Sequence, residues 1–385
     1  MIKSCLSCHL PETYETIEFD KNSVCSVCTG HKYKKKINWK DRKQKLDRLI
    51  NFFKGKHDYD CIIPFSGGKD STFTLHYLMK EYSIKPLVVR FNHGFYRPLV
   101  EENNQNTFKK LGVDFIDFTP NWKIVKLFMI ESFLRKTDFC WHCHTGIYSY
   151  PIRIAKLFNV PLVIWGETQS EITSYYSYED NKIEMEDEEK FNKIRTLGIS
   201  ADDMFSILNN HYDNIDRRDF INYTFPSKEE LKDLNLYSVA LGNYIPWDYK
   251  KNTDIIKKEL GWKVGELEGV PKFINSNGEK TECFMQGSRD YIKYLKRGYS
   301  RVTQINAFEL RNKRKTSKQA KKENKKYDGK EPHSLKILLN YLGLTKKEFY
   351  KIISKQVVYP NKMKISKQKS KKMSDYETWF KEKKN

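Results

Sequence analysis

Four short apolar segments that alternate with longer stretches of helical spacing constrain the fold of this 385-residue chain most strongly. Each segment is rich in β-branched or aromatic residues. The segments are residues 61–65, 86–91, 113–118 and 161–165. Strands that read as continuous apolar runs and are separated by helices are typical of a mainly parallel sheet covered by helices on both faces. The sequence therefore predicts an α/β fold of this kind.

The most specific motif follows the first of these segments and reads Ser66-Gly67-Gly68-Lys69-Asp70-Ser71. The glycine pair lets the backbone turn tightly and expose its N–H groups, and the helix predicted to follow adds the positive end of its dipole. The lysine adds a full positive charge. This arrangement predicts a phosphate-binding loop, although its spacing is not that of a Walker A loop. A structural turn without a ligand is the alternative.

Six of the eight cysteines form three C-x-x-C pairs. Cys5 and Cys8 are separated from Cys25 and Cys28 by a spacing that is typical of a four-thiolate Zn²⁺ site. A pair of disulfides is the alternative, and it disagrees with a reducing compartment. We expect a cytoplasmic protein, because no apolar run reaches the roughly 20 residues of a membrane helix and the segment MIKSCLSCHL lacks a signal-peptide core. Cys61, on the first apolar segment, is expected in the core.

Composition and periodicity suggest an order of parts along the chain. A zinc-ribbon module and a connecting helix are followed by a phosphate-loop domain, an acidic-aromatic insertion, the completion of the catalytic domain, a basic helical region and a basic disordered tail. The predicted boundaries are 1–30, 31–58, 59–169, 170–235, 236–310, 311–360 and 361–385. The insertion is predicted to form a lid, with Tyr175, Tyr176 and Tyr178, or a plain surface loop.

The formal charge of +21 is concentrated at one end of the chain. Residues 311–385 carry 24 Lys and Arg against seven Asp and Glu, which leaves a charge of only +4 for the rest. Nucleic-acid binding usually requires a basic surface on the folded body. We therefore expect no nucleic-acid partner, and we treat the basic tail as an accessory.

The S-G-G-x-D-S string between a strand and a helix resembles the PP-loop ATP pyrophosphatase superfamily. The resemblance implies that the loop grips the β,γ-phosphates of ATP while a substrate attacks the α-phosphate and pyrophosphate leaves. It implies catalytic roles for Lys69 and Asp70, the latter linked to Mg²⁺. The implied ATP-binding residues are Ser66, Gly67, Gly68, Lys69, Asp70, Ser71, Asn92 and Glu167, with Glu171 as a weaker candidate.

The third C-x-x-C pair, Cys140 and Cys143, lies within the predicted sheet domain. A similar pair occurs in tRNA-thiolating members of the superfamily, where it holds an iron–sulfur cluster with a third, distant cysteine. The resemblance implies that Cys283 is this third thiolate. Two alternatives stay open: a pair of ordinary buried thiols, or a zinc site that recruits His142 or His144.

The whole chain resembles the N-acetyl sugar amidotransferases of bacterial surface-polysaccharide biosynthesis, including pseudaminic and legionaminic acid pathways. The resemblance rests on the order of two C-x-x-C pairs, SGGKDS, DFCWHCHTGI, WGE, LGNYIPWD, CFMQGSRDYIKYLKRGYSR and YDGKEPHSL. It implies a ligase that adenylates the acetamido oxygen of an N-acetylated sugar and lets ammonia displace AMP, giving an acetamidino sugar. Arg289, Lys293 and Arg297 are candidates for binding an anionic sugar, or they form a solvated helix face.

The ammonia source is predicted from the cysteines. A glutaminase nucleophile would be a cysteine at position 2, which is Ile2, or on a G-x-C-x-G elbow, and the sequence has neither. The resemblance implies a separate histidine-biosynthesis-like glutaminase, with a cyclase-like subunit, as the partner. The main alternative function is a PP-loop enzyme that modifies tRNA by thiolation or lysidine formation. A zinc-containing interaction module is the non-enzymatic alternative.

Overall fold

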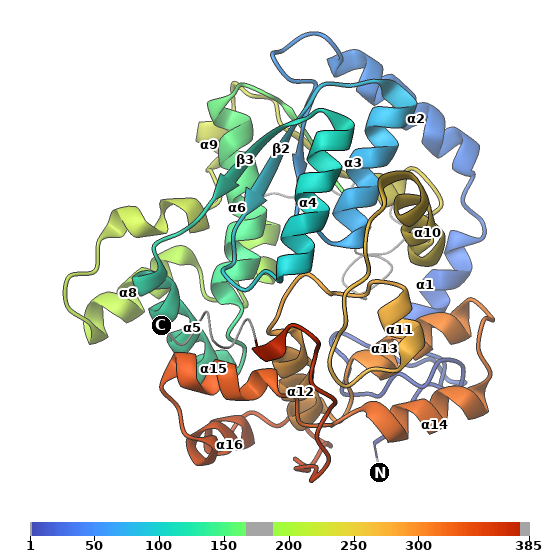
Figure 1. Ribbon diagram of the computed structural model, residues 1–385, viewed down its shortest axis with the longest axis vertical. Coiled ribbons are helices and arrows are strands. Elements are labelled where there is room, and N and C mark those ends of the chain that lie inside the picture. The colour runs from blue at the N-terminus through green and yellow to red at the C-terminus, as the bar shows by residue number, and fades with distance from the viewer. Residues whose placement is uncertain (1, 167–187, 378–385) are drawn as a thin grey trace. The chain divides into compact units, whose positions relative to one another are not determined.

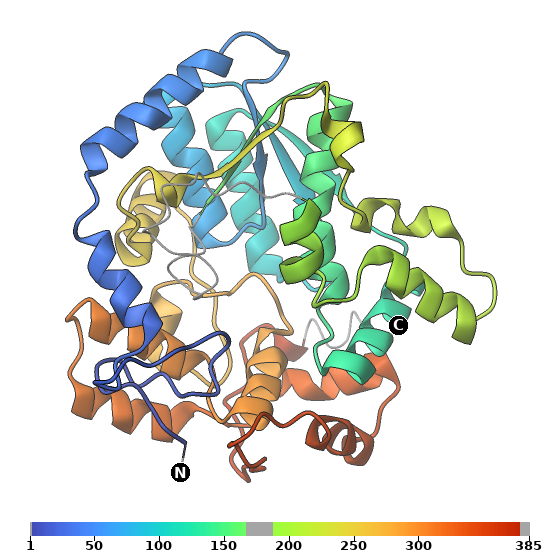
Figure 2. The same cartoon turned by 180° about the vertical axis from the view of Figure 1, so that it is seen from behind.

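The computed structural model describes residues 2–166 and 188–377. The described residues divide into two compact units, one of which joins two segments that are far apart in sequence. We call residues 38–166 and 188–263 the sheet unit, and residues 2–37 and 264–377 the helical unit. The chain colours of Figures 1 and 2 identify the segments of each unit.

The sheet unit contains a five-stranded parallel sheet in the order β3-β2-β1-β4-β5. The strands are β1 (Cys61–Pro64), β2 (Pro86–Phe91), β3 (Asp114–Phe118), β4 (Leu162–Trp165) and β5 (Tyr237–Ala240). In the central register, Ile62 pairs with Leu87 on one side and with Val163 on the other. The predicted parallel α/β fold is confirmed. The sequence did not reveal β5, because its four residues form a short segment that begins on the exposed Tyr237.

Helices cover both faces of this sheet. The crossovers from β1 to β2 and from β2 to β3 place α3 and α4 on one face, and α6 lies on the other, as Figure 1 shows. The helices of the unit are α2 (Trp39–Phe53), α3 (Lys69–Tyr82), α4 (Pro98–Leu111), α5 (Trp122–Lys136), α6 (Trp141–Leu157), α7 (Glu188–Lys190), α8 (Ala201–His211), α9 (Lys228–Leu231) and α10 (Tyr249–Leu260). A π-helical turn η2 (Phe191–Arg195) and two 3₁₀ turns, η3 (Arg217–Tyr223) and η4 (Leu241–Asn243), complete it.

The core of the sheet unit is aromatic and closely packed. Trp141 is fully buried against Phe128 and Tyr223, with ring centroids 4.9 and 5.7 Å away. Its indole N–H donates to the carbonyl oxygen of Ile199 at 2.8 Å, so its polar atom is satisfied. Cys61 is buried on β1 and burial raises the pKa of its thiol, which confirms the prediction of a core cysteine.

The helical unit contains seven helices among its described residues. They are α1 (Ser26–Lys34), α11 (Lys272–Ser276), α12 (Gln286–Arg297), α13 (Arg301–Arg311), α14 (Ser317–Tyr327), α15 (Ser334–Leu342) and α16 (Lys346–Ser354). Gly298 ends α12 with a φ of +79°. Over the described residues of both units, no helix combines the length and hydropathy needed to cross a bilayer.

A buried carboxylate organises the start of α15. Glu268 accepts hydrogen bonds from the backbone N–H groups of His333 and Ser334 and from the Ser334 hydroxyl, the last at 2.6 Å. An anion at a helix N-terminus is stabilised by the unpaired N–H groups and by the helix dipole. Glu268 therefore links the loop before α11 to α15.

Residues 361–377 differ from the disordered tail expected over 361–385. Ser370, Met373 and Tyr376 are buried. The N–H of Ser370 donates to the Glu331 carbonyl oxygen at 2.9 Å. This backbone pairing holds a segment whose lysine-rich composition alone favours disorder.

Candidate active site and metal centre

The loop after β1 is shaped by a glycine that no other residue can replace without a clash. Gly67 has a φ of +75°, and a Cβ on it would lie 2.4 Å from the Asn104 side chain and 2.7 Å from Val100 on α4. The loop begins beside β2, because the N–H of Phe65 donates to the Val89 carbonyl oxygen. Both the backbone conformation and the close approach therefore require glycine.

Two serine hydroxyls close this loop on itself. The N–H of Ser66 donates to Ser71 Oγ at 3.2 Å, and the N–H of Gly68 donates to Ser66 Oγ at 3.3 Å. Ser71 Oγ in turn donates to the Gly68 carbonyl oxygen. Gly68 is the N-cap of α3. The hydrogen bonds of the two serines therefore fix the loop that directly precedes the unpaired N–H groups of the first helical turn.

Lys69 and Asp70 occupy the first turn of α3. The Lys69 side chain is only 4% exposed, forms an ion pair with Asp70 and lies 5.7 Å from the Tyr249 ring centre. The second oxygen of Asp70, Oδ1, is buried without a hydrogen-bond partner among the described residues. Buried polar atoms are nearly always paired, so this carboxylate oxygen is suited to a ligand such as Mg²⁺.

The residue after β4 packs against the start of α3, and a residue after β5 contacts it in turn. A Cβ on Gly166, directly after β4, would lie 2.9 Å from Thr74 Oγ1 and 3.3 Å from the Asp70 carbonyl oxygen. The Gly166 carbonyl oxygen accepts from the N–H of Gly242, which follows β5. The strand order reverses between β1 and β4, and ligands of open α/β sheets bind at such a point. The predicted phosphate loop thus lies where the fold favours a ligand.

The two other implied ATP-binding residues differ in what the structure shows. Asn92 follows β2, and its side chain accepts from the N–H of Gly94 and donates to Thr119 Oγ1. These bonds shape the loop at the same edge of the sheet. Glu167 and Glu171 lie outside the described residues, as do Tyr175, Tyr176 and Tyr178 of the expected lid.

Two buried histidines near this edge were not singled out as a pair by the sequence. The Nε2 of His142 donates to the His93 carbonyl oxygen at 3.3 Å. Burial lowers the pKa of His93 to about 3, helped by the neighbouring His142 and Arg90, and burial lowers the pKa of His142 to about 4. Both imidazoles are therefore neutral at physiological pH. The sequence singled out His142 only as an alternative zinc ligand within C-W-H-C and gave no signal of its contact with His93.

The cysteines proposed for an iron–sulfur cluster belong to different units. Cys140 is the N-cap of α6 in the sheet unit, where its N–H donates to Asp138 Oδ1 at 2.8 Å, and Cys143 lies in the first turn. Cys283 precedes α12 in the helical unit, and burial raises its thiol pKa to about 12. The cluster remains a prediction.

The four N-terminal cysteines form one compact group. All four thiols are buried, and their sulfur atoms lie within 4.8 Å of one another. The Sγ–Sγ distances are 3.8 Å for Cys5 and Cys28 and 3.6 Å for Cys8 and Cys25. Tetrahedral coordination with Zn–S bonds of about 2.3 Å requires sulfur separations of about 3.8 Å. The residues therefore fit a metal ion of this kind, with all four positions filled by thiolates.

The segment that carries these cysteines packs against, and forms hydrogen bonds with, other parts of the helical unit. Its buried residues pack with Tyr299 and Ala307. The guanidinium of Arg297 donates to the Thr13 carbonyl oxygen at 2.5 Å and pairs with Glu15, whose carboxylate also accepts from the Tyr299 hydroxyl. Four thiolates would leave a bound metal ion no open coordination position, which is typical of structural sites.

The predicted sugar-binding cations lie on one face of α12. Arg297 is engaged by the N-terminal module as described, and burial lowers the pKa of Lys293. Lys293 Nζ donates to Gln304 Oε1 at 3.4 Å, and Arg289 is half-buried. The three residues are spaced four apart, which puts their side chains on the same face of α12. On this face Arg297 already contacts Thr13 and Glu15 of the same unit.

Residues 272–383 match the family described as "LPS biosynthesis protein WbpG-like, C-terminal domain". This match covers less than a third of the chain and begins at α11. An uncharacterized protein of Methanocaldococcus jannaschii is 28% identical over 166 residues, which are 43% of this chain and 58% of that protein. The aligned part of the chain thus spans somewhat more than half the length of this relative.

Two solved structures are similar over part of the chain. NMN synthetase from Francisella tularensis superposes with a TM-score of 0.25 and 14% identity, over 52% of this chain and 92% of that one. The U34-tRNA thiolase NcsA from Methanococcus maripaludis, solved with its 4Fe–4S cluster, gives a TM-score of 0.27 and 14% identity, over 67% and 82% of the two chains. At these TM-scores the likeness carries no argument about the reaction of this chain.

Proposed function

We propose that this protein is an ATP-dependent amidotransferase that converts the acetamido group of an N-acetylated sugar into an acetamidino group, in the biosynthesis of a bacterial surface polysaccharide. The observation that carries the proposal is the presence in one chain of two features. One is a preformed phosphate loop at the reversal point of a parallel sheet. The other is a region that matches an LPS-biosynthesis family.

The reaction has two balanced steps. The acetamido oxygen attacks the α-phosphorus of ATP, the bond to the β-phosphate breaks and the amide nitrogen loses its proton, giving an O-adenylated imidate and pyrophosphate. Ammonia then attacks the imidate carbon, the C–O bond to AMP breaks and one proton leaves, giving the amidine. An amide oxygen is a weak nucleophile, so alignment and charge neutralisation must supply most of the acceleration.

Residues of the sheet unit have defined parts in this scheme. The first-turn N–H groups of α3 and the ammonium group of Lys69 would hold the leaving phosphates. Asp70 Oδ1, buried and unpaired among the described residues, would hold Mg²⁺, which neutralises charge on the phosphates when bound. His93 and His142 are both neutral, so neither adds a positive charge to this edge of the sheet.

Ammonia is proposed to come from a separate glutaminase subunit, as the sequence predicts. The zinc-ribbon module would brace the helical unit, and Cys140, Cys143 and Cys283 would hold a cluster. Metal analysis of anaerobically purified protein, with its visible spectrum, separates these two centres. A colourless protein with one zinc per chain would contradict the cluster and leave the ribbon site intact.

The test of the proposed function is direct. Purified protein is incubated with ATP, Mg²⁺ and ammonium and with a panel of N-acetylated sugars, and the products are analysed by mass spectrometry. We expect stoichiometric AMP and pyrophosphate and a sugar lighter by about one mass unit, because NH replaces O. Asp70→Asn should reduce the rate at least about 100-fold, since loss of one group that stabilises transition-state charge has effects of this size.

Two results would contradict the proposal. One is ammonium-independent sulfur transfer to tRNA by the same preparation, which would favour the alternative class of PP-loop enzyme. The other is full glutamine-dependent activity of the isolated chain, which would show that the ammonia source is not a separate subunit.

A further inference from the structure

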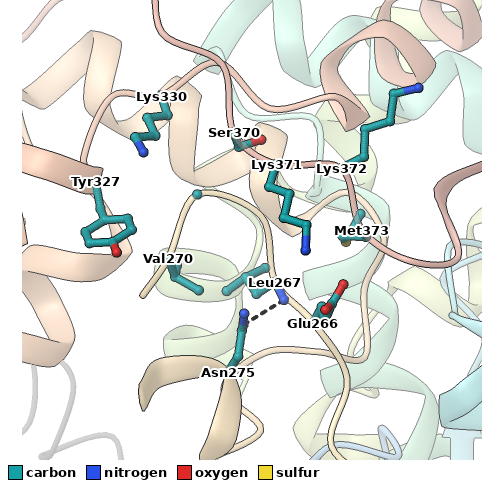
Figure 3. Close-up of a pocket in the computed structure, with 11 residues that line it drawn as sticks. Glu266, Leu267, Val270, Asn275, Tyr327, Lys330, Ser370, Lys371, Lys372 and Met373 are labelled. Carbon is teal, nitrogen blue, oxygen red and sulfur yellow. Dashed lines mark hydrogen bonds between the residues drawn. The ribbon is translucent and has the colours of Figure 1, made fainter. Parts of the chain in front are cut away.

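The helical unit contains a pocket that the proposed reaction has not used so far. It has a volume of about 140 Å³ and is formed by the loop 266–270, the end of α14 with the residues that follow it, and the segment 370–373 (Figure 3). All of these segments belong to one unit. The pocket can therefore be described without reference to the sheet unit.

Hydrogen bonds within the unit fix the walls of the pocket. The N–H of Leu267 donates to Asn275 Oδ1 at 2.8 Å. On the opposite wall, the N–H of Ser370 donates to the Glu331 carbonyl oxygen, and His333 Nε2 donates to the Ser370 carbonyl oxygen at 2.9 Å. The backbone on both sides is therefore held in place before any ligand binds.

The pocket carries an excess of positive charge. Three lysines line it against a single carboxylate, that of Glu266. Lys330 lies over the Tyr327 ring and Lys372 pairs with Glu377. Lys371 has neither an ion pair nor a hydrogen bond with any residue that the structure describes, and Figure 3 shows its side chain extending from the 370–373 segment toward Leu267 and Glu266.

A buried hydroxyl without a partner lies beside this lysine. Ser370 lines the pocket and is only 5% exposed, and its Oγ makes no hydrogen bond within residues 2–166 and 188–377. Such a group costs free energy unless it is paired, and a bound ligand would pair it. A hydroxyl donor next to a lysine is a suitable site for an oxyanion.

We propose that this pocket binds the oxyanion of an anionic sugar, with Lys371 and the Ser370 hydroxyl as its polar contacts. Apolar Leu267 and Val270 would contact the ring, and the carboxylate of Glu266 would accept from sugar hydroxyls. This inference rests on the proposed function, because it assigns the sugar substrate of that reaction to the helical unit. The oxyanion is either the phosphate of a nucleotide-linked sugar or the carboxylate of a free sugar acid.

The test measures binding without catalysis. The full-length protein is saturated with α,β-methylene-ATP and Mg²⁺, so that the phosphate loop is occupied and the bond between the α- and β-phosphates cannot be cleaved. It is then titrated by calorimetry with UDP-N-acetylglucosamine, N-acetylneuraminic acid, inorganic phosphate or neutral N-acetylglucosamine. We expect saturable binding of at least one anionic sugar and weaker binding of the neutral one. Preference for the first probe identifies a nucleotide-linked sugar, and preference for the second identifies a sugar acid.

Matched variants assign the binding to the pocket. Lys371→Ala should weaken binding of the preferred anionic sugar by about tenfold or more, since a charge-assisted hydrogen bond is lost. Lys367→Ala removes the same charge from an exposed neighbour outside the pocket and should leave the affinity unchanged. Ser370→Ala should weaken binding several-fold without lowering the melting temperature, because Oγ has no partner in the described part of the chain.

The outcomes separate this inference from the proposed function. Absence of saturable binding by either anionic sugar, or equal affinity of the wild type and Lys371→Ala, would overturn the pocket assignment, even if ammonium-dependent turnover is intact. Binding that Lys371→Ala abolishes, in a protein that fails to form an amidine from any sugar of the panel, would support the pocket and overturn the proposed reaction.

Discussion

The two units of this protein are stabilised by different interactions. The sheet unit is organised around a parallel sheet with a continuous aromatic core, in which Trp141, Phe128 and Tyr223 pack together. The helical unit depends on discrete links: four thiols, the Glu268 carboxylate at the start of α15, and the contacts of Arg297. Apolar burial is spread over many contacts, whereas each discrete link depends on a few atoms. Single substitutions should therefore affect the two units differently.

The largest effect is expected from the metal centre. Cys25→Ser should remove one metal ion per chain and destabilise the helical unit by more than about 4 kcal/mol, because metal binding supplies folding free energy directly. Elemental analysis measures the metal, and limited proteolysis with mass spectrometry locates the cleavage sites. Cleavage should fall in the helical unit. Cys61→Ala, which removes a buried cysteine of β1, is the control and should keep the metal; cleavage spread equally over both units would contradict the comparison.

The next effect concerns the phosphate loop. Gly67→Ala should reduce ATP-dependent pyrophosphate release about 100-fold, since the Cβ would displace the loop from Asn104 and misplacement by about 1 Å has effects of that size. Gly55→Ala is a matched control, because Gly55 has a similar φ of +73° but nothing within 4 Å of an added Cβ. Backbone strain is thus common to both variants. Equal loss of activity in both would show that the close approach at Gly67 is unimportant.

The third prediction is an acid sensitivity of the sheet unit. His93 and His142 have folded-state pKa values of about 3 and about 4, below the value of about 6.5 expected after unfolding. Below pH 6.5 the unfolded state binds more protons, so stability falls with decreasing pH, by about 2 kcal/mol for each histidine at pH 5.

Urea unfolding at pH 7 and pH 5 measures this loss. His142→Gln should be less stable than the wild type at pH 7 but should lose less stability between the two pH values. His211→Gln, at an exposed position of α8, serves as the control and should show the wild-type difference. An unchanged pH dependence in His142→Gln would refute the assignment to this histidine.

The smallest effect tests one link of the N-terminal module. Tyr299→Phe removes the hydroxyl that donates to Glu15 at 2.6 Å and should lower the stability of the helical unit by about 1.5 kcal/mol, the usual contribution of a hydrogen bond to a charged group. Thermal unfolding followed by near-ultraviolet circular dichroism measures it. Tyr359→Phe changes a residue that is 92% exposed and should have no effect. Equal melting temperatures for all three proteins would falsify this role.

The sequence predicted the sheet unit better than the helical one, for a physical reason. Runs such as 61–65 and 86–91 have the pattern of strands buried on both faces, and the SGGKDS loop has a fixed place after such a strand. The burial of Cys61 also followed from this pattern. By contrast, the pocket around Ser370 comes from backbone pairing between residues 331 and 370, which leaves no periodic signal in the sequence.

The site residues show the same contrast. The four N-terminal cysteines were found because metal ligation requires a recognisable spacing. The tight packing of Gly166 against α3 and the pairing of His93 with His142 were not predicted, since they depend on contacts between a loop and a helix that are distant in sequence. Arg297 was interpreted as a candidate for sugar binding, and its contacts with Thr13 and Glu15 can be seen only in three dimensions.

The discontinuity of the helical unit has a consequence for synthesis on the ribosome. Its cysteine module lies within the first 37 residues, whereas Tyr299 and Ala307, which pack against it, are translated after the whole sheet unit. The cysteine module must therefore wait for these later residues before its packing is complete. During this interval a metal ion would be the principal means of keeping the nascent module folded, so the metal supply during translation would govern the yield of folded protein.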